Sequence, residues 1–523
     1  MADSPAGSSD LRGGGGEFER LTPEQQRILA YASSIGSEFD FPLLVAAMGL
    51  GEESLAEQLE HLVHLGVLKE RAGGDRFVFA AEEVRAQVYR SLTESRLRVL
   101  HRKIAESMEK MHPTPGPETV AELGRHFFLG KVPEKSRDYN LRAAETARAN
   151  DDPESAAQYL ERVRVDLEAA RPTRPHELGQ VDETLGELYY SVGNFAAADR
   201  FFTEALGLAG SDEPRIRARL LLAKAEIARE GLDIETATRQ ALEALKLFEM
   251  TGDALGRGQT YRLLGRVSFH RGAYREALDE SMRALEAVGD RRDPRLLGQL
   301  SIDIGNAFAL LGPEVRSDAL HWYDKAIERL TQARDWVELS RAYHNLGVSV
   351  GELHPQDGLE YLERARESGD RAHDPRSVGR ALLSGVELRL ALGQLEEAAR
   401  DNEQAGRLLE RLADDLGLEQ VVVNRGLIAE KQGQWEDAER AYEKAMEICR
   451  KFRLRADEAE VYFYLARLRF KTRDLDASRH AFRAAESLGL PELRPNLAAQ
   501  FLELRHQLDE AGRTSPPDTN GGV

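Results

Sequence analysis

Cysteine and long apolar runs are almost missing from this sequence. Cys449 is the only cysteine among 523 residues, which excludes an intramolecular disulfide and a cage of thiolate ligands around a metal ion. Such cysteine usage is typical of a reducing compartment, and we expect a cytoplasmic protein. No window approaches 18 uninterrupted apolar residues, and residues 1–16 lack an apolar stretch. The sequence therefore predicts neither a membrane-spanning helix nor a signal peptide.

Aromatic residues are also scarce, and the 71 basic residues are outnumbered by 90 acidic ones. Aromatic residues make up 7% of the chain, and the formal net charge is −19. Because an acidic chain repels phosphate backbones, general binding of nucleic acid is disfavoured unless one face is locally basic. The hydrophobic fraction of 41% is enough for a long core and too large for a disordered chain. Alanine, leucine, glutamate and arginine dominate, and these residues favour helices.

A pattern of small residues repeats along the chain with a period close to 40 residues. In one copy Gly186 lies in a first helix, Gly193 lies in a turn, and Ala198, Phe202 and Ala205 lie in a second helix. The position of the small residue in the first helix recurs at Gly186, Ala225, Gly265, Gly305, Gly347, Val386, Gly426 and Ala466. Because one helical hairpin cannot bury its apolar face alone, we expect the hairpins to stack.

This pattern resembles the tetratricopeptide repeat, which has glycine and tyrosine in its first helix and an Ala-Phe-Ala series in its second. The usual period is about 34 residues, so the longer period here is similar to that of long-period repeats in signalling scaffolds such as kinesin light chains. The resemblance implies an all-α fold, a right-handed superhelical solenoid of helical hairpins. We predict about eight repeats over 179–490, degenerate hairpins over 113–178, a capping helix over 491–511, and disordered tails over 1–17 and 512–523.

Residues 18–112 follow a different pattern. Helices are predicted over about 22–35, 42–48 and 52–65, and two short alternating runs then flank the turn Gly73-Gly74-Asp75. Two such runs around a turn indicate a β-hairpin. Three helices followed by a hairpin form the winged-helix arrangement, and two more helices lead from it into the repeats.

This module resembles the winged helix of STAND-class signal-transduction ATPases, which precedes tetratricopeptide-like repeats in those proteins. The matching segments are 35–39, 65–68, 77–79, 84–89 and 100–105. There are two departures from the pattern. Ala81 stands where such sequences usually have histidine, and the ATPase domain is absent from this sequence.

Patterns that would carry catalytic or metal chemistry are incomplete. The segment 124–132 is the nearest match to a phosphate-binding loop, but five residues separate its glycines, and Val132 stands where Ser or Thr would hold magnesium. One face of the third helix could ligate a metal or be an ordinary solvated face; it gathers Glu57, Glu60, His61 and His64. We predict no catalytic residues, no metal site and no cofactor, and therefore not an enzyme.

The winged helix leaves a DNA-binding alternative open. Its third helix would enter the major groove, where cations and amides read bases and contact phosphates. That helix instead has four glutamates over 52–65 and neither lysine nor arginine, so DNA binding is not expected. Two hypotheses follow. One is a non-catalytic interaction scaffold or regulatory subunit, and the alternative is a transcription regulator that uses the winged helix for DNA and the repeats for an effector.

In tetratricopeptide domains the polar residues of the first helices line a concave groove that holds an extended peptide. By helical phase the candidates here are Glu187, Tyr190, Arg262, Arg266, His270, Asn306, Arg341, Asn345, Asn424, Arg467 and Lys471. Asn345 and Asn424 resemble the asparagines that bond to the ligand backbone in long-period repeats. Each candidate is otherwise an ordinary solvated helix residue. We expect a protein or peptide ligand, with a signalling ATPase or a kinase as candidate partners, and no membrane.

Overall fold

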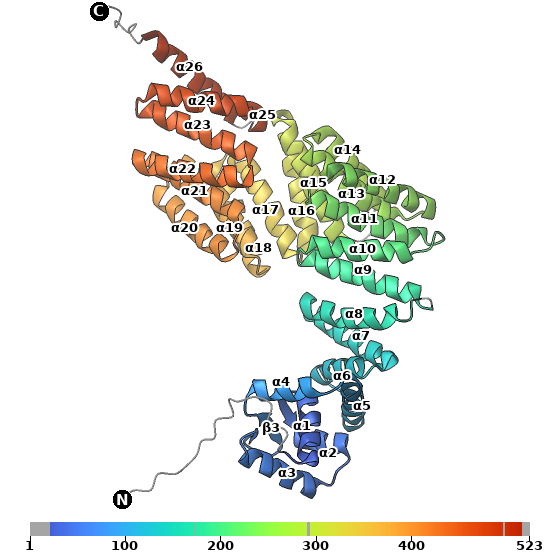
Figure 1. The fold of residues 1–523 in the computed structure, drawn as a ribbon. Coiled ribbons are helices and arrows are strands. Elements are labelled where there is room, and N and C mark those ends of the chain that lie inside the picture. Colours follow the sequence, from blue (N-terminus) through green and yellow to red (C-terminus); the bar gives the residue numbers. More distant parts are fainter. Residues whose placement is uncertain (1–20, 172, 290–292, 495–496, 515–523) are drawn as a thin grey trace, which may run out of the picture. The chain divides into compact units, whose positions relative to one another are not determined.

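The computed structural model describes residues 21–171, 173–289, 293–494 and 497–514 (Figure 1). The chain divides into two compact units, Met1–Asp253 and Ala254–Val523, and each is described by itself. Most of the predicted tails lie outside the described residues. The exception is 512–514, which belongs to the last helix.

The first unit begins with helices and a small sheet. The elements are α1 (Pro23–Ile35), β1 (Glu38–Asp40), α2 (Phe41–Met48), α3 (Glu52–His64), β2 (Leu68–Glu70), β3 (Arg76–Phe79), α4 (Glu82–Ser91) and α5 (Glu94–Met111). Thr22 caps α1, because its hydroxyl accepts from the backbone of Gln25 while the Gln25 side chain accepts from the backbone of Thr22. The observed order has a strand between the first and second helices, which the sequence pattern does not predict.

The sheet holds one strand more than the sequence pattern predicts. Its antiparallel order is β1-β3-β2, with Phe39 opposite Phe77 and Leu68 opposite Phe79. The sequence does not predict β1, because a strand of three residues is too short to show an alternating pattern. Phe39, Phe77 and Phe79 are buried in one core with Leu55 and Leu59 of α3, so the sheet and the helices close over a common apolar centre.

Helical hairpins follow in both units (Figure 1). In the first unit they are α6 (Pro117–Leu129), α7 (Pro133–Ala149), α8 (Pro153–Glu168), α9 (Pro175–Ser191), α10 (Phe195–Leu208), α11 (Pro214–Glu230) and α12 (Ile234–Thr251). Each helix packs on the next along the chain. From α9 onward, odd-numbered helices are the first helices of the hairpins and even-numbered helices are the second.

The second unit continues the same alternation. Its helices are α13 (Ala254–His270), α14 (Tyr274–Val288), α15 (Pro294–Leu311), η2 (Pro313–Val315), α16 (Arg316–Ala333), α17 (Trp336–Gly351), α18 (Pro355–Arg371), α19 (Pro375–Ala391), α20 (Leu395–Arg411), α21 (Asp415–Lys431), α22 (Trp435–Phe452), α23 (Arg455–Lys471), α24 (Leu475–Leu488), α25 (Leu490–Leu493) and α26 (Ala498–Thr514). The prediction of an all-helical solenoid of hairpins is confirmed.

The repeated small residues allow the two helices of a hairpin to approach closely. A Cβ atom built on Gly186 would lie 2.6 Å from Cε1 of Phe202, and one built on Gly305 would lie 2.6 Å from Cε1 of Tyr323. Both aromatic rings are buried. The small residue of the first helix and the aromatic ring of the second are therefore a matched pair, which explains why they recur together in the sequence.

The capping helix predicted over 491–511 is wrong in its extent. The structure has two helices there, α25 and α26, and the sequence has a proline at position 495 between them. The predicted apolar stripe does pack: Phe501, Leu504 and Leu508 of α26 are buried against the last hairpins.

Candidate functional site

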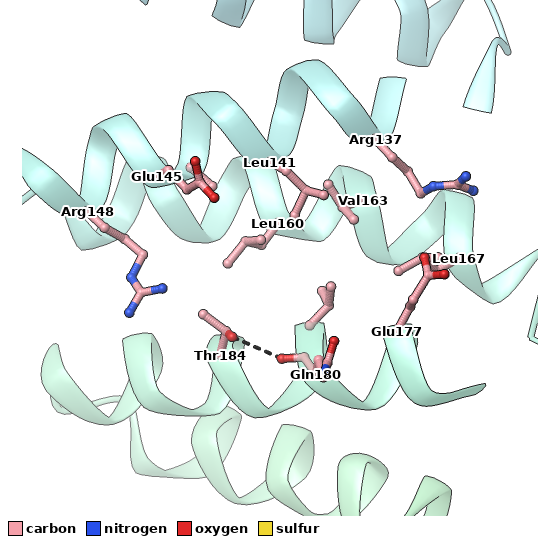
Figure 2. A pocket seen from close by; sticks show the side chains of 12 residues that line it. Arg137, Leu141, Glu145, Arg148, Leu160, Val163, Leu167, Glu177, Gln180 and Thr184 are labelled. Atoms are coloured by element: carbon pink, nitrogen blue, oxygen red, sulfur yellow. Dashed lines mark hydrogen bonds between the residues drawn. The ribbon is translucent and has the colours of Figure 1, made fainter. Parts of the chain in front are cut away.

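A cavity of about 220 Å³ opens in the first unit between α7, α8 and α9 (Figure 2). Helix α8 lines it with Leu160, Val163 and Leu167, and α9 lines it with Val181, all of them buried. Leu141 of α7 also lines the cavity and is 40% exposed. Six of the twelve lining residues are therefore apolar, and part of the wall is open to solvent.

Charged side chains stand at the edges of this cavity. Arg137 forms an ion pair with Glu134, and Glu177 accepts a hydrogen bond of 3.1 Å from Arg174. Arg148 and Glu145 of α7 are exposed, and the side chain of neither forms a hydrogen bond or ion pair with any other residue that the structure describes. Arg148 is thus a cation with unused hydrogen-bond donors beside an apolar wall.

Two predicted site residues lie further along α9. Glu187 is exposed, and shielding by the surrounding protein together with the charge of Glu183 raises the pKa of its carboxyl, against the opposing charge of Arg148. Tyr190 is half-buried and lies beside Phe195, with 5.5 Å between the ring centroids. The carboxylate of Glu187 is therefore close enough to Arg148 to interact with its positive charge.

The other predicted residues lie on first helices of the second unit. Consecutive first helices contact one another directly, α13 with α15, α15 with α17, α17 with α19 and α19 with α21, and contacts between consecutive second helices are sparser. The first helices are therefore on the inner side of the stack, where a repeat protein offers its binding surface. We call the polar side chains that these helices share the first-helix surface.

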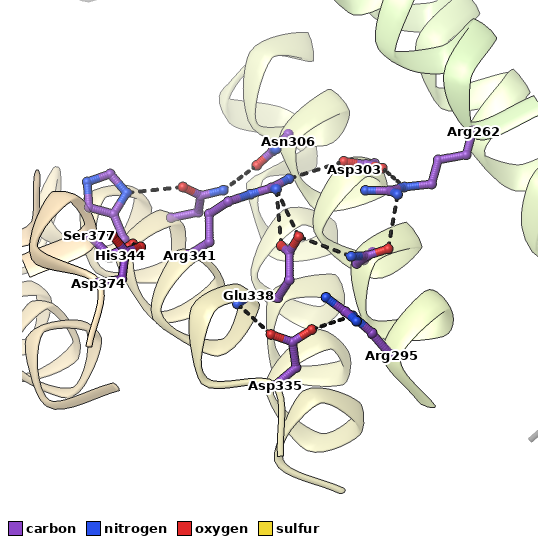
Figure 3. Close-up of polar contacts among 12 residues, drawn as sticks. Arg262, Arg295, Asp303, Asn306, Asp335, Glu338, Arg341, His344, Asp374 and Ser377 are labelled. Atoms are coloured by element: carbon purple, nitrogen blue, oxygen red, sulfur yellow. Dashed lines mark hydrogen bonds and ion pairs between the residues drawn. The ribbon is translucent and has the colours of Figure 1, made fainter. Parts of the chain in front are cut away.

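Two asparagines connect α15 and α17 on this surface (Figure 3). The amide of Asn345 donates to Oδ1 of Asn306 at 2.7 Å, and the same oxygen accepts from the hydroxyl of Tyr323 at 2.9 Å. His344 lies 3.1 Å from Oδ1 of Asn345 and 2.9 Å from the hydroxyl of Ser384 on α19. Burial lowers the pKa of His344 to about 4, so the ring is neutral at neutral pH.

Beside the asparagines, an ion-pair ladder joins three first helices (Figure 3). Nε of Arg262 on α13 lies 2.7 Å from Oδ2 of Asp303 on α15, and its Nη1 donates to Gln299 at 3.0 Å. Arg341 on α17 reaches the other oxygen of Asp303 at 3.5 Å and Glu338 at 3.0 Å. The structure thus brings Arg262 and Arg341 together on one carboxylate.

A second charged cluster joins α21 and α23. The carboxylate of Glu430, which is 5% exposed, accepts from Arg467 at 2.9 Å and from Lys471 at 2.7 Å. The hydroxyl of Tyr442 donates to the same carboxylate at 2.9 Å. These contacts outweigh the effect of burial and lower the pKa of Glu430, so it remains an anion.

The remaining candidates differ in accessibility. Arg266 is half-buried, and His270 is exposed with Nδ1 2.7 Å from the carbonyl oxygen of Arg266. Asn424 is 0% exposed, its amide donates to the Leu383 carbonyl at 3.4 Å, and it accepts from Gln420 at 3.1 Å. Asn424 therefore ties helices together inside the stack, and we leave it out of the first-helix surface.

The sequence analysis missed the acidic partners of these cations. Asp303, Glu338 and Glu430 were not among the candidates, yet they hold the arginines and Lys471 in place. For two of them a signal is present in the sequence, because Asp303 and Glu430 lie 37 to 41 residues from their cations, close to one repeat, whereas Glu338 lies three residues from Arg341. Opposite charges separated by one period indicate contacts between neighbouring first helices.

The N-terminal module offers an acidic surface. All four glutamates of α3, at 52, 53, 57 and 60, are exposed. His61 of the suggested metal-binding face lies with Nδ1 2.6 Å from the side-chain nitrogen of Gln25, and His64 contacts its own backbone. Over the described ranges, the structure has no group of three or more metal-ligating side chains. None of the helices it describes is long and apolar enough to cross a membrane.

Residues 418–488 match the family model of the tetratricopeptide repeat. This stretch covers α21 to α24, the hairpins with Gly426 and Ala466, and it confirms the prediction of this repeat there. No curated protein matches the sequence.

Several solved structures have a similar fold. One is a signal transduction ATPase with numerous domains (STAND) with a tetratricopeptide repeat sensor, from Pyrococcus horikoshii; it is 16% identical with a TM-score of 0.47, and the match covers 85% of this chain and 66% of that one. This chain thus spans just under two thirds of that protein. Aspartyl phosphate phosphatase F from Bacillus subtilis is 12% identical with a TM-score of 0.47, covering 68% and 94%. The quorum sensor NprR from B. thuringiensis, in its apo form, is 14% identical with a TM-score of 0.41, covering 59% and 98%.

Proposed function

We propose that the chain is a non-catalytic interaction scaffold or regulatory subunit, and that the first-helix surface of its second unit binds a partner peptide or protein. A signalling ATPase or a kinase is the class of partner that we favour, on the resemblance of the N-terminal module to those of STAND-class ATPases. The observation that carries the proposal is the pair of amides, Asn306 and Asn345, held on neighbouring first helices.

These amides suit the main chain of an extended ligand. Oδ1 of Asn306 already accepts two hydrogen bonds, whereas no partner for its Nδ2 is found among the described residues, so two N–H groups remain for ligand carbonyls. Tyr323 and Asn345 fix the position of the side chain. A side chain that is held in place beforehand loses little entropy when a ligand binds, which favours affinity.

The proposal is tested by comparing variants of the whole chain as baits. Partners retained by the wild type and identified by mass spectrometry are purified, and their affinity is measured by calorimetry. We expect Asn306→Ala combined with Asn345→Ala to weaken binding at least tenfold. The matched control is Gln332→Ala with Gln404→Ala, which removes two exposed amides from the second helices α16 and α20. Equal affinities for both double variants, each with unchanged helicity, would refute the site.

We further propose that residues 18–112 form a winged-helix module that packs against neighbouring helices and does not bind DNA. The exposed glutamates of α3 support this, because a recognition helix needs cations where it meets phosphates. The whole chain, titrated into random duplex DNA at low salt, should show no binding below about 100 μM, the weak end of non-specific affinity. Tight binding that falls steeply with salt would favour the transcription regulator.

A further inference from the structure

We propose that the cavity between α7, α8 and α9 is an anchor site for a peptide ligand, which inserts one large apolar side chain and places an adjacent carboxylate against Arg148. This inference rests on the proposed function only in taking the ligand to be a peptide. The cavity lies in the first unit, and none of the residues of the first-helix surface lines it.

The size of the cavity sets the size of the occupant. Its volume of about 220 Å³ is several times the ~30 Å³ that one water molecule occupies in the liquid. It is also below the range of roughly 300–1,000 Å³ that is typical of sites for whole drug-sized molecules. A single aliphatic or aromatic side chain fits between these limits, with the rest of the ligand outside.

The chemistry of the wall fits an apolar group. Leu160, Val163, Leu167 and Val181 turn buried side chains toward the cavity, and Leu141 is held at its mouth with 40% of its surface exposed. A ligand methyl group would cover this exposed surface as well as its own. The hydroxyl of Thr184 on α9 needs no hydrogen bond from the ligand, because it already donates to the carbonyl of Gln180 at 2.9 Å (Figure 2).

The charge beside the cavity fits a carboxylate. Figure 2 shows the guanidinium of Arg148 in the gap between α7 and α9, whereas the carboxylate of Glu145 lies along α7. Arg137, at the other end, is already paired with Glu134. A carboxylate one residue from the inserted side chain would therefore reach Arg148, whose donors no other described residue uses.

Capped dipeptides provide a direct test on the whole chain. The probes are acetyl-Leu-Asp-amide, acetyl-Leu-Asn-amide, which lacks the charge, and acetyl-Ser-Asp-amide, which lacks the apolar side chain. Titrations followed by saturation-transfer NMR on the leucine methyl groups, or on the acetyl methyl for the serine probe, give dissociation constants. We expect the loss of the leucine to weaken binding about 10- to 100-fold, and the loss of the charge to weaken it about two- to fivefold, because Arg148 is exposed.

Variants locate the binding. Thr184→Trp should fill the mouth of the cavity and abolish binding, whereas the control Thr238→Trp replaces a half-buried threonine of α12 that is outside the cavity. Arg148→Glu should reverse the preference from acetyl-Leu-Asp-amide to acetyl-Leu-Lys-amide, and Arg142→Glu on the same helix should not. The reversal is a gain of affinity that an unfolded variant cannot produce.

Two outcomes would overturn the proposal. One is equal binding of the leucine and serine probes, which would show that no apolar side chain is inserted. The other is that octanoate binds more tightly than any dipeptide and that Thr184→Trp abolishes this binding. This result would assign the cavity to a fatty acid. Failure of these probes leaves the partner affinity of the asparagine variants unaffected, so the two sites are tested separately.

Discussion

A buried chain of hydrogen bonds joins α4, α5 and α6, and it predicts that acid loosens this part of the first unit. The hydroxyl of Tyr89 lies 2.9 Å from Nε2 of His101, and Nδ1 of His101 lies 2.9 Å from Nδ1 of His126. Nε2 of His126 lies 3.5 Å from the carboxylate of Glu122. Nε2 of His126 also lies 3.2 Å from Nη2 of Arg125. In either tautomer, one of the two Nδ1 atoms donates the shared hydrogen and the other accepts it.

The contact between the two histidines needs one Nδ1 without a proton. A proton added to the accepting Nδ1 would face the N–H of the other ring, donor against donor. Both histidines are 1% exposed, and burial lowers the pKa of each; for His101, burial and then the positive charges of His126 and Arg125 lower it to about 3. The pKa of Glu122 is lowered to about 2, chiefly by its hydrogen bond to His126.

The sign and size of the effect follow from these pKa values. An unfolded histidine takes up a proton near pH 6.5, whereas folded His101 does so only near pH 3. The unfolded state therefore gains protons first, and stability is lost as the pH falls below 6.5. Between pH 6.5 and pH 4.5 only the unfolded state binds the proton of His101. Over these two pH units the free energy of unfolding falls by roughly 3 kcal/mol. Glu122 contributes only below about pH 4.5, so the window from 6.5 to 4.5 belongs to the histidines.

Hydrogen–deuterium exchange resolved by segment measures this loss. After correction for intrinsic rates, the free energy of opening of α5 and α6 should fall by roughly 3 kcal/mol between pH 7 and pH 4.5, while that of α12 in the same sample changes less. The non-titrating double variant His101→Gln with His126→Gln should show a much smaller fall. The reasoning is refuted if the wild type and the double variant lose the same free energy over this window.

Three further predictions concern packing and turns, each read by chemical denaturation. Gly186→Ala should lower the free energy of unfolding by about 1–3 kcal/mol, because the new Cβ would lie 2.6 Å from a buried ring. The control Gly207→Ala should cause no loss of stability, because its Cβ would meet no atom within 4 Å. Leu232→Gly should stabilise by about 0.5–1 kcal/mol, because this exposed leucine adopts φ 58°, which glycine tolerates better. Tyr442→Phe should cost about 1.5–3 kcal/mol by removing a hydrogen bond to the buried Glu430; no loss would contradict that contact.

The sequence predicts the hairpins well because their signal is repeated and physical. A small residue such as Gly305 faces the ring of Tyr323, and the same pairing recurs between Gly186 and Phe202 and between Gly426 and Tyr442. The turns are less regular. Gly193 adopts φ 77° as the turn signal implies, but in the next copy Leu232, and not the neighbouring Gly231, has the positive φ. A tolerated strain of this kind has no sequence signature.

The site residues are harder to predict, because helical phase gives the side of a helix and not the depth of a side chain. Asn345 and Asn424 have similar sequence surroundings, yet Asn345 is half-buried at the surface whereas Asn424 is fully covered. The difference depends on how closely neighbouring helices pack, which is a property of side chains far away in the sequence. The cavity likewise has no motif, since side chains of the three helices α7, α8 and α9 line it together.

The charged groups of the first-helix surface are engaged before any ligand arrives. Arg262 and Arg341 share Asp303, which is 9% exposed. A ligand carboxylate that took both guanidinium groups would leave that buried charge unpaired, at about 3–5 kcal/mol, and would gain no more than about 1 kcal/mol for each new solvent-exposed pair. Affinity must therefore come from groups that can still form hydrogen bonds, such as the N–H groups of Asn306. We accordingly expect partner binding at this surface to weaken only slightly with salt, and a steep dependence on ionic strength would show that the ion pairs do open.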